Sequence, residues 1–176
     1  LELLAADLGG PNRAIGVRCD VTEWDQNVAL AADATDAFGQ IDAVFCNAGF
    51  GAARGWLNET PEHWRSMVLT NVLGAAYTAR AVIPALTESR GHLLLTGSVA
   101  GRRALPGSLY SATKHAVHAM GEAIRADVAG TGIRTTIIAP GMTDTPFFDE
   151  RPSDALEPDD IARAVLYALG QPEHVN

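Results

Sequence analysis

The sequence has little cysteine and no arrangement of residues suited to a metal. Its two cysteines, Cys19 and Cys46, belong to no CxxC pair and have no cysteine or histidine neighbours at metal-ligand spacing. We therefore expect neither a disulfide framework nor a bound metal. Each cysteine stands near the end of an apolar run, which favours a small buried side chain. Scarce cysteine is typical of a reducing compartment, so we expect a cytoplasmic protein.

Positive charge is also scarce. The 13 Lys and Arg residues are outnumbered by 21 Asp and Glu residues, which gives a net charge of −8 without any basic stripe. We therefore expect neither nucleic acid nor a membrane surface as a partner. No apolar run approaches the length that crosses a bilayer, and the start LELLAADLGG resembles the end of a helix rather than a signal peptide. A hydrophobic content of 47% predicts one soluble domain over residues 1–176.

Short apolar runs alternate with longer segments of helical period. The runs that predict buried strands are Ala14–Cys19, Ile41–Cys46, His92–Thr96 and Arg134–Ala139. The expected helices run from Thr22 to Phe38, from Pro61 to about Leu86, from near Ser108 to Gly130, and from Pro158 to the residue before Gly170. Thr22 with Asp25 resembles a capping box, and Thr60 precedes a proline at the first helical position. This alternation predicts a parallel α/β sheet that helices cover on both faces.

Tyr110 and Lys114 stand four residues apart in the sequence YSATK. On a helix this spacing puts both side chains on one face. A phenol with a pKa of about 10 is a poor acid or base at neutral pH, but a nearby ammonium stabilises the phenolate and lowers that pKa. The pair therefore suggests a tyrosine that exchanges a proton with a carbonyl or alcohol oxygen. Such pairs also arise by chance, so the pair alone does not establish catalysis.

Polar and turn-forming residues follow the predicted strands. Ser98 ends the run HLLLTGS, while Asn47–Gly49, Pro140-Gly141 and Asp20 follow the other three strands. Open α/β sheets bind their ligands at the carboxyl ends of the strands. One such end would indicate only a turn. Four together predict a crevice in which the Ser98 hydroxyl holds a substrate oxygen against Tyr110.

Six short motifs stand in the order and spacing of one known family. They are CDV at Cys19–Val21, NAG at Asn47–Gly49, Asn71, GS at Gly97-Ser98, YxxxK at Tyr110–Lys114 and PG at Pro140-Gly141. Each motif is weak alone, but the ordered series is specific. The sequence resembles the short-chain dehydrogenase/reductase family over nearly its whole length.

The resemblance implies an α/β fold with a Rossmann-like doubly wound parallel sheet. The family's strand order is 3-2-1-4-5-6-7, in which Ala14–Cys19 would be strand three and Ile41–Cys46 strand four. The first two strands, the last strand and the glycine-rich TGxxxGxG loop have no counterpart, so we expect a chain truncated at both ends. Ala14–Cys19 is then expected to lack a strand partner rather than to pair with Ile41–Cys46. The chain alone is expected to bind NAD(P)H weakly or not at all.

The resemblance also implies four catalytic residues. Tyr110 would be the general acid/base, and Lys114 would lower its pKa and hydrogen-bond the nicotinamide ribose. Ser98 would orient the substrate and stabilise the reacting oxygen. Asn71 would support a proton-relay water near Lys114, although an asparagine inside a helix can also form a local backbone bond.

The implied cofactor is NAD or NADP, which supplies the hydride chemistry while the protein handles the proton. Besides Tyr110 and Lys114, the residues expected to contact it are Asp20 and Val21 near the adenine, Asn47, Ala48 and Gly49 on the adenosine side, Pro140 and Gly141, Thr143 at the carboxamide, and Thr145 at the carboxamide or phosphates. The implied substrate is a small secondary alcohol or carbonyl compound.

Several other residues admit two interpretations. The irregular stretch Asp144–Glu157 is a surface loop or a lid over the active site. Within it Phe147-Phe148 could line a substrate pocket, as could Trp56, with simple packing as the alternative. His115 and His118 follow the YxxxK motif, but without a third ligand nearby they do not indicate a metal site.

Three hypotheses about function follow. The leading one is an NAD(P)-dependent dehydrogenase or reductase acting on CH–OH groups. The absence of the glycine-rich loop favours the alternative of a catalytically silent fragment or pseudoenzyme that serves as an oligomerisation module. A sugar-nucleotide epimerase also uses YxxxK, but it needs a large substrate domain. The family commonly pairs two long helices, here Pro61–Leu86 and Ser108–Ala129, and their small residues favour a homodimer or homotetramer.

Overall fold

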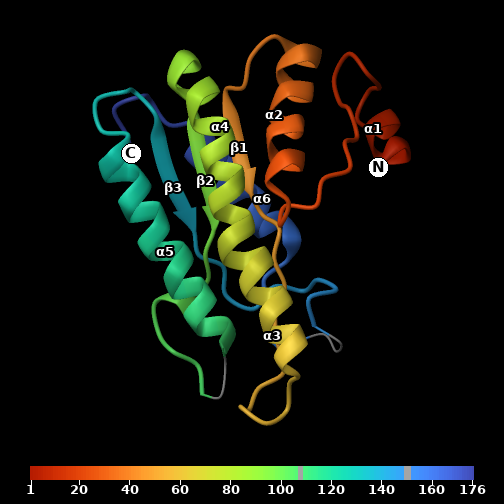
Figure 1. Cartoon of the computed structure of the whole chain (residues 1–176), viewed down its shortest axis with the longest axis vertical. Helices are drawn as coiled ribbons and strands as arrows, with labels where there is room; N and C mark the ends of the chain where they lie inside the picture. The colour runs from red at the N-terminus through yellow and green to blue at the C-terminus, as the bar shows by residue number, and fades with distance from the viewer. Residues whose placement is uncertain (107–108, 149–151) are drawn as a thin grey trace.

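A parallel sheet forms the centre of the molecule. The computed structural model describes residues 1–106, 109–148 and 152–176. Within them, strands β1 (Ala43–Cys46), β2 (His92–Thr96) and β3 (Arg134–Ile138) lie in the order β1-β2-β3, as Figure 1 shows. Both strand pairs are parallel, so all three strands point the same way. Three predicted strands and the parallel arrangement are confirmed.

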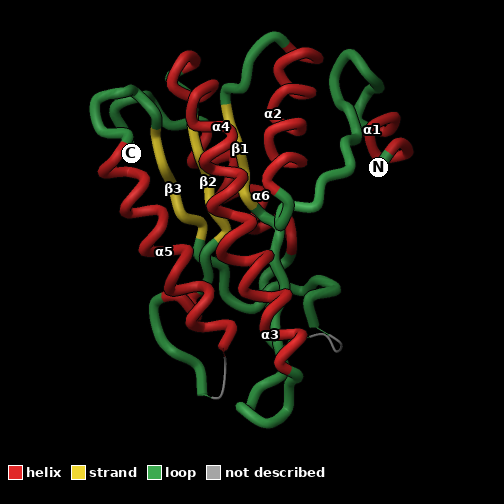
Figure 2. Tube along the Cα trace, viewed as in Figure 1, coloured by secondary structure: helices red, strands yellow, loops and turns green. Residues whose placement is uncertain are grey.

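The run Ala14–Cys19 does not form the predicted buried strand. It has no regular secondary structure, and each of its residues is exposed or half-buried. Figure 2 shows it as part of a loop outside the helix that follows it. Apolar residues favour a strand only where a neighbouring strand accepts their backbone hydrogen bonds, and within the described residues no strand pairs with this run. The expectation that it lacks a partner and does not pair with residues 41–46 is confirmed.

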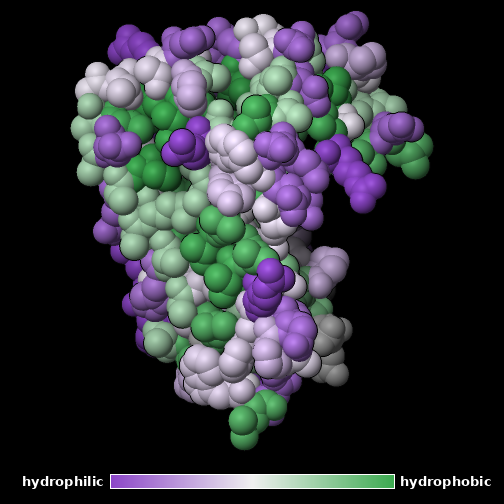
Figure 3. Space-filling view, viewed as in Figure 1, coloured by the Kyte–Doolittle hydropathy of each residue, from purple (hydrophilic) through white to green (hydrophobic). Residues whose placement is uncertain are grey.

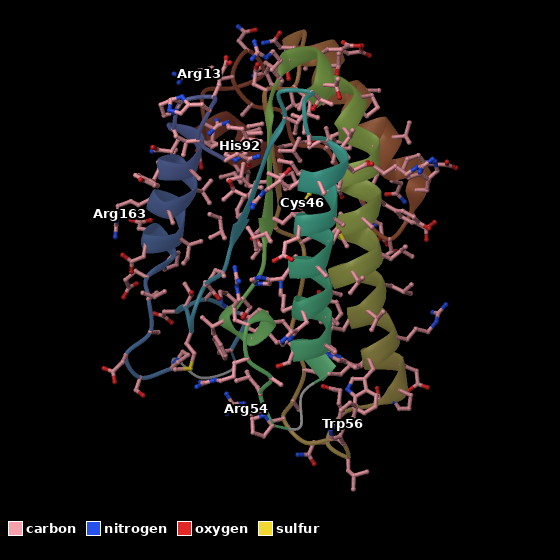
Figure 4. All side chains as sticks on the ribbon, turned by 90° about the vertical axis from the view of Figure 1, so that its left-hand side faces the viewer. Arg13, Cys46, Arg54, Trp56, His92 and Arg163 are labelled. Atoms are coloured by element: carbon pink, nitrogen blue, oxygen red, sulfur yellow. The ribbon has the colours of Figure 1, made fainter. Side chains whose placement is uncertain are left out.

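Helices cover both faces of the sheet. Helices α4 (Ala75–Ser89) and α5 (Leu109–Asp127) cover one face, with α2 (Trp24–Phe38) beside α4, while α6 (Pro158–Leu169) covers the other. The view in Figure 4 shows the sheet between α6 and the pair formed by α4 and α5. The first helix, α1 (Glu2–Asp7), lies outside α2. This is the expected doubly wound arrangement; the expected start of α5 near Ser108 lies outside the described residues.

Two helix ends follow their sequence signals. The Thr60 hydroxyl accepts a hydrogen bond from the backbone N–H of His63 at 3.1 Å, and so caps α3 (Pro61–Val68). Gly39 ends α2 with a φ of 86°, a left-handed conformation that glycine adopts without strain.

The predicted capping box of α2 is wrong. The residue that precedes the helix is Glu23, whose side chain forms no capping hydrogen bond. The Thr22 hydroxyl instead donates to Oδ1 of Asp20 at 2.8 Å. The helix begins at Trp24, two residues after the predicted start.

The longest helical run is Pro61–Ser89, which contains α3, the π-helical segment η1 (Leu69–Gly74) and α4. It extends beyond the predicted end near Leu86. In the described part of the chain, this run of 29 residues is long and apolar enough to cross a bilayer by length and composition, contrary to our expectation that no segment approaches that length. Its buried residues Ala79, Val82 and Leu86 belong to the core. The apolar composition therefore suits a helix that covers a sheet.

The core lies between the sheet and the α4–α5 layer. Its buried members are Ile41, Ala79, Val82, Leu86, Leu93, Val128 and Ile133. Leu93 has no exposed surface and lies on the central strand. Strands covered on both faces show continuous apolar sequence rather than alternation, which explains the run of three leucines in β2.

Replacing Leu93 with alanine should remove buried apolar contacts and leave a cavity. We expect Leu93→Ala to lower the free energy of unfolding by about 2–5 kcal/mol, measured by urea denaturation. The control is Leu166→Ala on α6, because Leu166 is 66% exposed and its loss should change stability by less than about 0.5 kcal/mol. Equal effects of the two substitutions would contradict this assignment of the core.

Candidate active site

The carboxyl ends of the strands meet at one edge of the sheet, as parallel strands require. The segments that follow β1, β2 and β3 are joined there by hydrogen bonds. The Thr96 hydroxyl donates to Oδ1 of Asn47 at 2.8 Å, and the backbone N–H of Val99 donates to the carbonyl of Pro140 at 3.0 Å. The structure therefore brings together the residues that follow three of the predicted strands.

Helix α5 carries Tyr110 and Lys114 to this edge. Lys114 is 5% exposed, and its ammonium donates a hydrogen bond to the carbonyl oxygen of Thr96 at 2.7 Å. Its Nζ lies 5.6 Å from the centre of the Tyr110 ring, within the range of a cation–π contact. The helical spacing of the two residues thus places both beside the end of β2.

Ser98 faces Tyr110 from the turn after β2. It is 8% exposed, and its side chain is near enough to Tyr110 to lower the pKa of the phenol. Its Oγ also accepts a hydrogen bond from the backbone N–H of Ala100 at 3.1 Å, which caps the short helix η2 (Val99–Gly101). The Ser98 hydroxyl is therefore fixed by the turn that it caps.

Burial changes the pKa values of Tyr110 and Lys114 in opposite directions. Desolvation raises the pKa of Tyr110 above 10.0, and the neighbouring Ser98 side chain offsets part of the rise. Desolvation lowers the pKa of Lys114 from 10.5 to about 8. Desolvation thus sets the direction of the Tyr110 shift, and the expected lowering of this pKa by Lys114 stays a prediction.

Asn71 lies in η1 and is 2% exposed. Its side chain pairs with the backbone of Phe50, donating to the carbonyl at 2.9 Å and accepting from the N–H at 3.0 Å. Its amide also donates to the hydroxyl of Thr113 at 3.2 Å. These partners are distant in sequence, so the side chain of Asn71 does not form the local backbone bond that was the alternative to a functional role. Asn71 holds the loop after β1 against α5, at a π-helical segment of a kind often found at functional sites.

Gly49 lies between Asn71 and Lys114. A Cβ at this position would lie 3.0 Å from Oδ1 of Asn71 and 3.8 Å from Nζ of Lys114. Asn47, Ala48 and Gly49 are all exposed. The NAG segment therefore forms an open surface beside the two polar side chains.

Asp20 and Val21 lie outside the sheet but next to the same helical run. Asp20 is exposed, and its pKa is lowered because the backbone and side chain of Thr22 donate hydrogen bonds to its carboxylate. Val21 packs against Gly74 at the end of η1, where an added Cβ would lie 2.7 Å from Cγ2 of Val21. Gly74 thus permits this segment to approach the helix that carries Asn71.

The residues after β3 form an irregular loop. Gly141 is exposed, and Thr143 and Thr145 are half-buried. Thr143 forms an isolated parallel bridge with Leu156, so the two ends of the loop lie side by side. Residues 149–151 of the expected loop or lid lie outside the described residues.

Phe147 is a contact of the candidate site that the sequence only suggested. Its ring packs edge-on against that of Tyr110 with centroids 5.6 Å apart, and it packs on Phe148 at 5.2 Å. A Cβ at Gly51 would lie 2.8 Å from the Phe147 ring. Trp56, by contrast, is 56% exposed and packs edge-on against Trp64.

Two further residues beside the site were not predicted. Thr113 bonds Asn71, and the imidazole of His118 lies next to the backbone of Ser98. For His118 the spacing is the signal that could have found it, since it follows Lys114 by one helical turn.

Cys19 and Cys46 are free and half-buried rather than fully buried. Desolvation raises the pKa of Cys46 to about 12, so its thiol is a poor nucleophile. In residues 1–106, 109–148 and 152–176, no group of three or more His, Cys, Asp or Glu side chains could hold a metal ion.

Comparison with known proteins identifies the family. The model of the short chain dehydrogenase family matches residues 1–156. The chain belongs to this family. It is 39% identical over 162 residues to an uncharacterized oxidoreductase of Staphylococcus saprophyticus, with 89% of this chain and 69% of that relative covered. Membership of the family makes the chain a relative of oxidoreductases.

Solved structures of family members share the fold. An alcohol dehydrogenase from the archaeon Thermococcus sibiricus, in complex with 5-hydroxy-NADP, superposes with a TM-score of 0.87 at 27% identity, covering 99% of this chain and 75% of that one. Serine dehydrogenase from Escherichia coli gives a TM-score of 0.80 at 32% identity, covering 91% and 71%. The short-chain dehydrogenase fold inferred from the sequence motifs is thus confirmed.

The lowered pKa of Lys114 can be measured directly. We expect the ¹³Cε signal of lysine-labelled protein to titrate with a midpoint of about 8, identified by its absence from Lys114→Met. The folded protein then binds fewer protons than the unfolded chain between pH 8 and 10.5. The unfolding free energy of the wild type, relative to Lys114→Met, should therefore rise with pH across this window by up to about 3 kcal/mol. A lysine midpoint near 10.5 would contradict the prediction.

Proposed function

We propose that the chain is an NAD(P)-dependent oxidoreductase that interconverts a secondary alcohol and a ketone, with Tyr110 as the general acid/base. The observation that carries the proposal is the meeting of three side chains, in which the Lys114 ammonium lies 5.6 Å from the centre of the Tyr110 ring and Ser98 lies near enough to lower the pKa of the phenol. These groups come from two separate elements and meet at the carboxyl edge of the sheet. That edge is where open α/β sheets bind their ligands.

In this proposal Tyr110 donates its phenolic proton to the carbonyl oxygen during reduction, and accepts a proton from the alcohol in the reverse direction. Its raised pKa keeps the phenol protonated at neutral pH, which suits donation. Ser98 supplies a second hydroxyl beside the phenol, to orient the substrate and stabilise the reacting oxygen. The edge-on ring of Phe147 offers an apolar wall next to the same phenol.

The residues around Gly49 fit a nicotinamide cofactor. A Cβ at Gly49 would enter the space beside Asn71 Oδ1 and Lys114 Nζ, so the glycine leaves a cradle next to two polar groups. The related alcohol dehydrogenase of Thermococcus sibiricus is described in complex with 5-hydroxy-NADP, which supports the same class of cofactor for this chain. When bound, the cofactor supplies or accepts the hydride.

We assign the contacts of the cofactor by family motif. Lys114 would donate to the ribose, Asp20 and Val21 would lie near the adenine, and Asn47, Ala48 and Gly49 would line the adenosine side. Pro140, Gly141, Thr143 and Thr145 would bound the nicotinamide end. Asn71 would hold a proton-relay water near Lys114, because both residues border the space at Gly49.

Removal of the Tyr110 hydroxyl should abolish the proton transfer and leave cofactor binding in place. We expect Tyr110→Phe to lower turnover by about 10²–10⁴-fold, because general acid–base catalysis contributes this much. Cofactor affinity, measured by calorimetry, should change little. The measurements use the protein at its natural full length, with Tyr167→Phe as a matched control because Tyr167 is 72% exposed on α6.

This experiment also distinguishes the proposed enzyme from a catalytically silent module. Near wild-type turnover in Tyr110→Phe would refute the role of Tyr110. A wild-type protein that binds no NAD or NADP and reduces no ketone would favour the catalytically silent module. Activity of the wild type with loss in Tyr110→Phe alone supports the proposed enzyme.

We also propose a homodimer or homotetramer built on α4 and α5. Figure 3 shows apolar residues gathered on the face formed by these helices. A hollow of about 650 Å³ lies there between α2, α4 and α5, with Ala76, Ile83, Met120 and Ile124 among its lining residues. Small and apolar residues of this kind allow the helices of a second copy to pack closely.

Light scattering of the natural full-length protein at micromolar concentration should give the mass of a dimer or tetramer. Ala119→Arg, at an exposed position on α5, should shift the mass towards the monomer, because it places a charge in the helix pairing. Ala162→Arg, at an exposed position on α6, is the matched control and should not change the mass. A wild type that is strictly monomeric would refute the assembly.

A further inference from the structure

The imidazole of His118 contacts the backbone of Ser98. His118 lies on α5, one turn after Lys114, and is 5% exposed. Its Nε2 is 3.2 Å from the carbonyl oxygen of Ser98 and 3.5 Å from the backbone nitrogen of the same residue. The shorter distance favours an Nε2–H that donates to the carbonyl. Its Nδ1 is buried and has no hydrogen-bond partner among the described residues.

Two glycines make room for this ring. A Cβ at Gly97 would lie 2.6 Å from Nε2 of His118, and a Cβ at Gly101 would lie 2.5 Å from its Cδ2. These glycines bound the turn that carries Ser98. The imidazole therefore fills the space between the turn and α5, where a side chain at either glycine would displace it.

The same turn fixes the hydroxyl of Ser98. The carbonyl oxygen of Ser98 accepts from the backbone N–H of Gly101 at 2.9 Å, besides its contact with His118. The Ser98 hydroxyl accepts from the backbone N–H of Ala100 at 3.1 Å. Any shift of the Ser98 backbone thus moves the hydroxyl that lies beside Tyr110.

The charge state of His118 suits a structural donor. Desolvation and the neighbouring Arg102 lower its pKa, which keeps the imidazole neutral at pH 7. A neutral imidazole donates one hydrogen bond without placing a charge beside Ser98. The same residue would be poorly suited to act on substrate itself, since the Ser98 backbone occupies its Nε2.

We propose that His118 is a positioning residue that holds the Ser98 hydroxyl in place for reaction at Tyr110. The inference rests on the proposed function. Tyr110, Lys114 and His118 stand at successive turns on one face of α5, and each contacts the end of β2 or the turn after it. The first two would meet substrate and cofactor. His118 acts through the backbone of Ser98.

The test replaces His118 with glutamine or with asparagine in the natural full-length protein. The amide nitrogen of glutamine reaches about as far as Nε2 of histidine, whereas that of asparagine falls short of Ser98. We expect His118→Asn to lower kcat by about 10–100-fold, because a small misplacement of a reacting group costs this much. KM for the cofactor should stay within about twofold, and His118→Gln should restore kcat to within a few-fold of the wild type.

A double variant shows whether His118 acts through Ser98. Ser98→Ala should lower kcat by itself, and adding His118→Asn to it should cause no further loss, since the group being positioned is already gone. His115→Asn, at an exposed neighbouring position, is the matched control and should keep full activity. Should His118→Asn fail to fold, His118→Leu takes its place in both comparisons.

The failure of this inference can be told apart from failure of the proposed function. Loss of activity in Tyr110→Phe and Ser98→Ala with full activity in His118→Asn would overturn only the role of His118. Equal losses in the asparagine and glutamine variants, or additive losses in the double variant, would also overturn it. Full activity in Tyr110→Phe would instead overturn the proposed function.

Discussion

The contact on which the site depends is the hydrogen bond from the buried ammonium of Lys114 to the carbonyl of Thr96. Removing a charge from water is costly, and in the described residues only desolvation shifts the pKa of this lysine, with no carboxylate to compensate. The carbonyl oxygen of Thr96, at the end of β2, is therefore the hydrogen-bond partner of the buried ammonium. This bond joins α5 to the end of β2 beside Ser98, on the helix that also carries Tyr110.

Three glycines near the strand ends allow side chains from the helices to approach closely. Gly49 borders Lys114 and Asn71, while Gly97 and Gly101 border His118. A side chain at Gly97 or Gly101 would enter space that the His118 ring now occupies, whereas one at Gly49 would fill the space beside Asn71 and Lys114. These glycines therefore act by their lack of a Cβ, and none of the three has a positive φ. The polar groups of the site lie within a few ångströms of one another as a result.

Stability and chemistry come from opposite ends of the same elements. Leu93 packs beneath α4 in the core, while Thr96, at the other end of β2, serves the site. Likewise Val128, just past α5, is a core residue, whereas Tyr110 lies in the first turn of that helix. Burial of the apolar ends holds the strands and helices in register. The polar ends therefore stand on rigid elements.

The sequence alone determined the parallel sheet, because runs such as His92–Thr96 are apolar throughout and helices separate them. Motif order also indicated the family and the candidate residues. Only the tertiary structure decided the rest. Ala14–Cys19 is apolar enough for a strand, yet no neighbouring strand in the described part of the chain pairs with it, and hydrogen-bonding partners are a property of the whole fold. The upward shift of the Tyr110 pKa likewise depends on burial, and the role of His118 depends on a turn 20 residues earlier in the chain. Spacing along one helix shows which side chains share a face, but not what that face meets.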